Sequence, residues 1–476
     1  MPEITPLHDQ TPPNEATKDE IQEGWKGDHL IKICATDGQE RFKDLNKSST
    51  KSCTIFKANV VLHESNSDAY KPKLISIGPY HKKNPQLRSM ENYKLRYLQQ
   101  FLQRKLGIDV ESCIREMEKL KDEALKCYDD IGDLDPDIVG KFSEMLLLDG
   151  CFIVEYMREV FQIKREAEDK IVNAEWMVSL IDRDLLLLEN QLPFFVLTKL
   201  HDMTKLDPEE SLLKMVKYNF CGSLPRVTPK YLSQTHCNVK GIKHLLHVVH
   251  TCVASHQLSR QRSHFVTFES EWTLKAKDSE IWHDLVRSAT ELDEAGVKFS
   301  KVGDIYRMLD KDNMGDSTSL FDINFDAGLM KIPCFEVVTG TETMLRNLVA
   351  YEQHSSDVYH KYFTDYVVLM DRLINSEKDV KLLRLKGIIR NRIGDDNEVA
   401  VIFNKLGEGV IPSTQFYYKE TCKKVVKHCD KRWNRWMANL RHNYFNGPWV
   451  GLSTAAAVFL LVLTLMQTVL TFVSTL

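Results

Sequence analysis

The sequence predicts a mainly α-helical protein: a large helical globular body, a small β element at about residues 296–338, and one C-terminal transmembrane helix. Three observations predict this class. Apolar residues recur at helical spacing over most of the body. The stretch 296–338 instead consists of short apolar runs separated by Asp, Asn and Gly, which is typical of strands and turns. Residues 449–476 contain no charged side chain.

The C-terminal stretch 448–476 is predicted to span a membrane. At about 1.5 Å per residue, a helix of this length exceeds the ~30 Å hydrocarbon core of a bilayer. Pro448 suits a first helical turn, where its missing N–H costs nothing, and Trp449 then lies where an interfacial aromatic residue belongs. A buried core helix is the alternative, but the run is too long and too uniformly apolar for it.

A basic amphipathic helix is predicted just before the span, at 419–447. Its apolar stripe consists of Cys422, Val426, Cys429, Trp433, Trp436 and Leu440. The residues that we expect at the membrane interface are Lys423, Lys424, Lys427, Lys431, Arg432, Trp433, Arg435, Trp436, Arg441 and Trp449. Three roles for the stripe stay open: packing against the protein's own body, lying on anionic headgroups, or binding a partner helix.

Charge and cysteine patterns indicate an orientation. Basic residues outnumber acidic ones before the span, so the positive-inside rule predicts a cytosolic body and tail-anchored topology. The first 20 residues lack the apolar core of a secretory signal. Eleven cysteines without a CxxC pair suit free thiols in a reducing compartment. Both the plasma membrane and the endoplasmic reticulum fit a single-pass anchor of this kind.

The remaining chain divides by composition. Residues 1–50 are polar and aperiodic, which predicts a disordered tail. Residues 51–418 are predicted to form the mainly helical body. Within it, residues 201–290 are less regular and are a candidate for a variable region. The formal net charge of −4 argues against a nucleic-acid partner, since such proteins usually carry a basic field.

Four acids inside or beside apolar runs are the candidates for buried polar roles: Asp149, Asp182, Asp184 and Glu189. Paired carboxylates can act as acid and base or bind a divalent metal. The alternative is structural. Asp182 and Asp184 suit the N-terminus of a helix, where they would accept backbone N–H bonds. Asp149, within LLLDGCF, needs a buried partner or its pKa rises. We favour the structural interpretation for all four.

The sequence offers little support for a metal site or for a known catalytic or nucleotide-binding motif. His244, His247 and His250 follow one another by three, so they fan out around a helix, and a zinc site usually pairs histidines at i and i+4. The sequence contains no GxSxG, no GxxxxGK[ST] and no GxGxxG. We therefore predict no catalytic residue, no metal ligand and no cofactor, and we expect a protein that is not an enzyme.

Several segments, in a fixed order, carry a family resemblance. The matching segments are Asp68-Ala69-Tyr70 with Pro72 and SIGPYH; MENYK, 90–94; EMLLLDGCFIVEYM, 144–157; DRDLLLLENQLPFFVL, 182–197; IKHLLHVVH, 242–250; ATELDEAGVKF, 289–299; IPCFEV, 332–337; LRNLVAYEQ, 345–353; and YFNGPWVGLSTAAAVFLL, 444–461. Together they resemble the plant family called domain of unknown function 247, also uncharacterised protein family 0481. One departure is visible: Ile55–Asn59 lacks the Val-Pro that members usually carry there, which puts the local turn in doubt.

The resemblance implies a plant membrane-associated protein without established enzymatic activity. Some grass members are linked to self-incompatibility, which suggests recognition or signalling. The resemblance supplies no catalytic residues. We expect membrane lipid and a protein partner, and self-association stays open. The leading hypothesis is therefore a membrane-tethered interaction or signalling protein. The alternatives are a membrane-anchored enzyme, such as a hydrolase that uses buried carboxylates, and a sensor of anionic lipid surfaces.

Overall fold

The computed structural model describes residues 53–129, 134–162, 171, 174–221, 241–261, 287–302, 319–431 and 448–475. Contacts between Cα atoms divide the chain into two units, Met1–Cys53 and Thr54–Leu476. The predicted polar tail, 1–50, lies outside the described residues. The mainly helical class, with few strands and one C-terminal apolar helix, is confirmed.

The first part of the body consists of helices. Their bounds are α2 (Val60–Ser65), η1 (Ser67–Ala69), η2 (Pro85–Met90), α3 (Glu91–Gln103), α4 (Val110–Leu125), α5 (Pro136–Gly140), α6 (Phe142–Gln162), α7 (Glu175–Leu185), α8 (Phe194–Thr204), α9 (Leu212–Cys221) and α11 (Leu245–Gln261). The stretch 201–290, expected to be less regular, thus contains α9 and α11 among its described residues. Both are apolar enough to pack on neighbouring helices.

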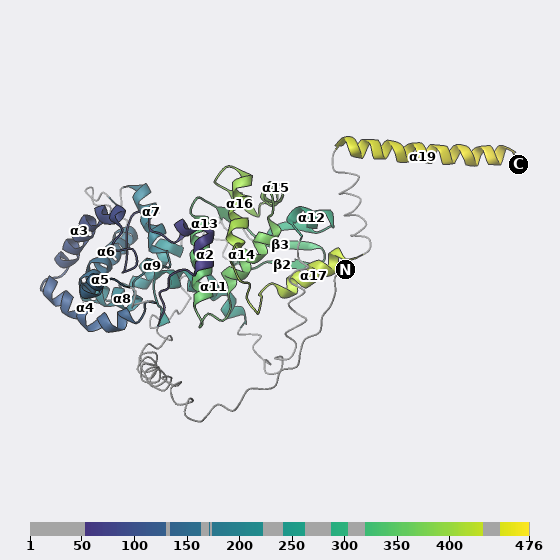
Figure 1. Cartoon of the computed structure of the whole chain (residues 1–476). Helices are drawn as coiled ribbons and strands as arrows, with labels where there is room; N and C mark the ends of the chain where they lie inside the picture. Colours follow the sequence, from purple (N-terminus) through teal and green to yellow (C-terminus); the bar gives the residue numbers. More distant parts are fainter. Residues whose placement is uncertain are drawn as a thin grey trace, which may run out of the picture. The chain divides into compact units, whose positions relative to one another are not determined.

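Helix α6 is the centre of this part and contacts α3, α4, α8 and α9 (Figure 1). Its apolar residues extend all round, as expected for a helix covered on every side, and residues 149–158 are all buried. Gly150 lets α8 approach, since a Cβ there would lie 2.4 Å from Leu200 Cδ1.

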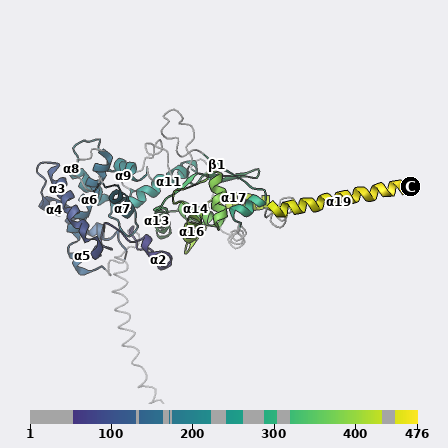
Figure 2. The ribbon, with the colours of Figure 1, turned by 90° about the horizontal axis from the view of Figure 1, so that it is seen from above.

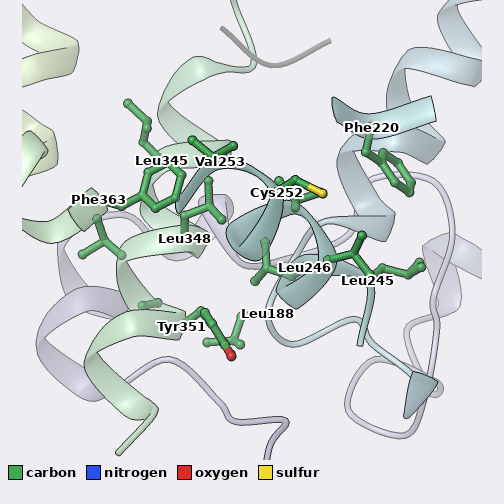
Figure 3. Close-up of a cluster of buried hydrophobic side chains, with 14 of the residues drawn as sticks. Leu188, Phe220, Leu245, Leu246, Cys252, Val253, Leu345, Leu348, Tyr351 and Phe363 are labelled. Carbon is green, nitrogen blue, oxygen red and sulfur yellow. The ribbon is translucent and has the colours of Figure 1, made fainter. Parts of the chain in front are cut away.

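Helix α11 joins the first part of the body to the second. Leu246 and Val253 of α11 lie toward Leu348 of α13 (Thr341–His354), and Leu245 lies toward Phe220 of α9, in one apolar cluster (Figure 3). The cluster is buried, and α11 and α13 are in contact. Through this packing of residues about 100 positions apart, the described helices on both sides of α11 share one hydrophobic core.

The second part combines helices with two small sheets. Its further helices are α12 (Ala289–Glu294), α14 (Tyr362–Leu373), α15 (Glu377–Leu385), α16 (Asp396–Gly407) and α17 (Lys419–Cys429). Helices α13, α14 and α16 lie side by side (Figure 2). Ser288 and Ser376 begin α12 and α15 with capping boxes, which satisfy backbone N–H groups that the first turn leaves free.

The β element falls in the expected range with one addition. Strands β1 (Lys298–Val302), β3 (Leu329–Pro333) and β2 (Asn324–Asp326) form a sheet in that order, with β1 parallel and β2 antiparallel to β3. β4 (Phe335–Val337) pairs in parallel with β5 (Ile389–Asn391). β5 lies outside 296–338 and was not expected, because three residues after a helix give too short an alternation to recognise.

Helix α19 (Pro448–Thr475) follows the body. Its segment Ala456–Ser474 is apolar enough to cross a membrane by length and composition, and none of it is buried. Large apolar side chains such as Leu460, Leu465 and Phe472 are 63–69% exposed there. The core of the body consists of such side chains in buried positions, whereas α19 exposes them along its length.

Candidate functional site

Three of the four candidate acids converge on one irregular segment, residues 73–81, which belongs to no helix or strand. Asp184 is the first. Its carboxylate accepts the backbone N–H groups of Lys73 at 3.0 Å, Leu74 at 2.7 Å and Ile75 at 3.0 Å. Burial raises the pKa of Asp184, and these N–H groups, together with Arg183, act in the opposite direction. The side chain therefore substitutes for a neighbouring strand.

Asn190 continues this substitution. Its Oδ1 accepts the N–H of Ile77 at 2.7 Å, and its Nδ2 donates to the carbonyl oxygen of Ile75 at 3.1 Å. Both residues are buried, so each backbone group would otherwise lose its hydrogen bond with water. Gln191 completes the local structure by donating to the carbonyls of Leu185 and Leu187, both at 2.7 Å.

Asp149 holds the end of the segment and a buried lysine. Its Oδ2 accepts the N–H of Gly78 at 3.0 Å, and its Oδ1 lies 2.6 Å from Lys94 Nζ. Both side chains are 0% exposed. Lys94 also donates to the carbonyl of Ser76 at 2.6 Å and pairs with Glu91 at 2.7 Å. The lysine thus has an acceptor for each of its three N–H groups.

Gly78 fits this site for a steric reason. Its φ of +73° is unfavourable for side chains, and a Cβ would lie 2.7 Å from the carbonyl oxygen of Gln191. Tyr128 donates to that same oxygen at 2.9 Å. The backbone of the segment therefore lies directly against the loop that connects α7 to α8.

Glu189 contacts the end of the 73–81 segment, whereas Asp182 does not contact it. Glu189 accepts the N–H of Ala58 at 2.9 Å and lies 3.3 Å from His81 Nε2. Asp182 lies elsewhere and accepts from Tyr156 Oη at 2.8 Å and Asn219 Nδ2 at 3.1 Å. Burial raises the pKa of Asp182 to about 6, and these two donors lower it in part.

The expected capping role of Asp182 and Asp184 is wrong. Both belong to the last turn of α7, which ends at Leu185, and the next helix, α8, begins only at Phe194. The helix ends within the apolar run LLLL that follows the acids, and the loop after it supplies Asn190 to Ile75 and Ile77. The carboxylate of Asp184 does accept backbone N–H groups, but those of a segment about 110 positions away, whereas Asp182 accepts from two side chains.

Sequence reasoning did not single out Lys94, Asn190 or Gln191. Each lies in a segment noted for its resemblance, and each is a polar residue with an apolar one within two positions. That contrast was the available signal. It cannot reveal Asp149 as a partner of Lys94 or Ile77 as a partner of Asn190, because these partners lie 55 and 113 positions away.

The three histidines surround Tyr351 and do not converge on one point. The ring centroids of His244, His247 and His250 lie 5.2, 5.5 and 5.2 Å from that of Tyr351. His250 Nε2 is 2.9 Å from Glu352 Oε1, and burial lowers the pKa of His247 to about 3. In the described part of the chain, no group of three or more His, Cys, Asp or Glu could hold a metal ion.

The predicted interface residues are described only in part. Helix α17 buries Cys422, Val425 and Cys429 and contacts β2. Val425 is more buried than the expected Val426 because the centre of the stripe lies between them. His428 packs on Phe325 with ring centroids 5.5 Å apart. For residues 419–429, the apolar stripe therefore packs against the protein's own body.

The lysines of this helix point away from the buried stripe. Lys424, Lys427 and Lys431 are exposed, and Lys423 is half-buried and pairs with Glu420 at 3.1 Å. Arg432, Trp433, Arg435, Trp436 and Arg441 lie outside the described residues, as does the side chain of Trp449. The described lysines form a positively charged face on α17 and just after its end at Cys429.

The fold and these contacts define a class: a mainly helical body, stabilised by buried carboxylate–backbone contacts, with a C-terminal apolar helix of transmembrane length. The sequence pattern of a plant family, described as plant protein of unknown function (DUF247), matches residues 55–463. The chain belongs to this family.

Two named relatives extend the match. The UPF0481 protein At3g47200 of Arabidopsis thaliana is 30% identical over 440 residues, which cover 90% of this chain and 88% of the relative. The putative UPF0481 protein At3g02645 of the same plant is 24% identical over 496 aligned positions, with 87% and 89% covered. No solved structure matches the chain. The resemblance seen in the sequence is thereby confirmed.

Proposed function

We propose that the chain is a membrane-tethered protein whose helical body acts by binding other proteins, in recognition or signalling, and not by catalysis. The observation that supports membrane tethering is the character of α19, whose segment Ala456–Ser474 is apolar and has no buried part. Leaving a Leu, Val or Phe side chain in water costs about 1.5–3 kcal/mol relative to burial. A row of such side chains therefore favours transfer of the helix into a bilayer.

The contacts of the candidate acids support a non-catalytic body. Asp149, Asp184 and Glu189 use their oxygens for backbone N–H groups and for neighbouring side chains. A general acid or base must reach a substrate proton, and a carboxylate committed to the backbone is poorly suited to that. The anchored hydrolase is accordingly the weaker of the two proposals.

Truncation tests the tether. We expect a chain that ends at Asn446 to move from the membrane pellet to the soluble fraction and to keep its helical circular dichroism signal. The reason is that the body buries its own apolar faces. The matched control removes residues 1–50 instead, keeps α19, and should stay in the pellet. Fractionation by ultracentrifugation provides the measurement.

Two results would contradict this proposal in different ways. If the truncated chain aggregates, the body is not independent of α19. Should it stay folded but still pellet with membranes, the basic face of α17, with Lys424, Lys427 and Lys431, would bind headgroups. Such binding must weaken with salt, because exposed charges are screened over about 8 Å at physiological ionic strength.

Protease protection tests the orientation. For sealed membranes that contain the chain with an N-terminal epitope, we expect digestion of the epitope without detergent. The basic residues before α19 favour a cytosolic body, by the positive-inside rule. An epitope on the C-terminus serves as the control, since it should be protected until detergent is added. The reverse pattern would refute the cytosolic body.

A further inference from the structure

The polar side chains of α19 gather on one side of the helix. At 100° per residue, six of them fall within an arc of about 120°. They are Ser453, Thr464, Gln467, Thr468, Thr471 and Ser474. We call this set the polar face. Val458, Val462, Met466, Val469 and Val473 occupy the opposite side. Among the described side chains of residues 452–474, the polar ones thus lie on one side of the helix, with Leu460 as a large apolar residue among them, and the opposite side is apolar.

The hydroxyls of this face are satisfied within the helix, but Gln467 is not. Thr464, Thr468 and Thr471 donate to carbonyl oxygens four positions earlier, at 2.8, 2.7 and 2.8 Å. The side-chain amide of Gln467 makes no hydrogen bond within the described part of the chain. That amide has two donors and an acceptor.

Gln467 lies well inside the apolar segment. It is about 16 Å from Ala456 and about 10 Å from Ser474 along the helix axis, at 1.5 Å per residue. Water does not reach that depth, and an unpaired amide there costs several kcal/mol. The favourable solution is a hydrogen bond to another helix, for which Ser, Thr, Asn and Gln are the usual residues.

We propose that α19 associates in the membrane with α19 of a second copy of this chain through the polar face, with Gln467 paired to Gln467. This inference rests on the membrane anchoring proposed above. Copies inserted by the same route are parallel, so a two-fold axis places each residue opposite its own counterpart. The Gln467 amide is self-complementary, since the amide of one copy can both donate a hydrogen bond to the amide of the other copy and accept one from it. No charge opposes the contact.

Small side chains make close approach possible. Ser453, Ala456 and Ala457 begin the polar face, and hydroxyl-bearing residues continue it around Gln467. Two helices with such residues in contact gain van der Waals packing as well as the amide hydrogen bonds. A partner helix of another protein would need a matching amide or hydroxyl at the same depth, whereas a second copy supplies it without further conditions.

Disulfide crosslinking of the full chain in its membrane tests the pairing. Thr471→Cys places a thiol on the polar face, and Val469→Cys places one at nearly the same depth on the opposite side. The native cysteines all precede residue 430, so the unmodified chain gives the background. With copper phenanthroline and oxygen as oxidant, two thiols lose their hydrogens and form one S–S bond. We expect a dimer several-fold more abundant from Thr471→Cys.

Removing the amide isolates its contribution. Gln467→Met keeps the length of the side chain and should weaken self-association about 5- to 30-fold. Met466→Leu, on the apolar side, is the matched control and should leave the dimer unchanged. Equal crosslinking on both sides, a product of a different mass, or an unaltered dimer in Gln467→Met would overturn the proposal.

Alkaline extraction of the same membranes separates the two proposals. If the chain resists extraction but does not crosslink, self-association is wrong and the anchor stands. If alkali releases the chain, the anchor itself is wrong, and self-association through a membrane face is refuted with it. Retention in the membrane together with crosslinking on the polar face supports both.

Discussion

Asp149→Ala is expected to destabilise the body by about 3–5 kcal/mol, the largest effect of a single substitution that we predict. The variant takes from Lys94, which is 0% exposed, the fully buried one of its two carboxylate partners, at 2.6 Å, and leaves it with Glu91 at 2.7 Å. It also removes the acceptor of the buried Gly78 N–H. A buried charge that loses part of its compensation and a buried N–H that loses its acceptor both destabilise the folded state. Urea unfolding of the chain that ends at Asn446, followed by circular dichroism, measures the change.

A double variant distinguishes the destabilisation caused by the unbalanced buried charge from that caused by the altered shape of the site. Asp149→Leu combined with Lys94→Met removes both charges and should recover most of the lost stability, since an apolar pair has no desolvation penalty. Lys119→Ala is the surface control: that lysine pairs with Glu116 but is 67% exposed, and the change should cost less than about 1 kcal/mol. A cost below about 1 kcal/mol for Asp149→Ala would contradict the buried pair.

Asp365 is expected to make the stability of the body fall as pH rises from about 4 to 7. Its carboxylate accepts from Ser413 Oγ at 2.9 Å and from the N–H of Tyr417 at 2.8 Å, which fixes the chain that leads into α17. Burial raises the pKa of Asp365 to about 7, and these donors lower it in part. Between the unfolded value of 3.8 and about 7, the folded state keeps a proton that the unfolded state has lost.

The sign can be tested with Asp365→Asn, which stays neutral and keeps an acceptor oxygen for Tyr417. We compare the free energy of unfolding of the native chain with that of the variant at each pH. The difference between them should fall by about 4 kcal/mol between pH 4 and 8, because each unit by which folding raises the pKa of Asp365 corresponds to about 1.36 kcal/mol. Asp109→Asn serves as the control. Ser112 lowers the pKa of that exposed carboxylate, so its difference should change only on acidification, in the opposite direction. A flat difference for Asp365→Asn would refute the prediction.

Local patterns predicted much of the fold. The burial of α6 and the strands near 298–337 follow from residue spacing and composition over a few turns or a few residues. The pairing of β4 with β5 does not, because Phe335 and Ile389 are 54 positions apart and β5 has only three residues. The same reason explains the mistaken caps at Asp182 and Asp184, since a local rule was applied to residues with distant partners.

The sequence by itself determined the family and the apolar character of α19, because both depend on the order and kind of residues alone. A run of 28 residues without charge is apolar in any tertiary setting. Only the tertiary structure decided what the buried acids do. Asp149, Asp184 and Glu189 acquire their roles from N–H groups between 71 and 131 positions away. The role of a carboxylate depends on the groups around it, and only folding brings those groups together.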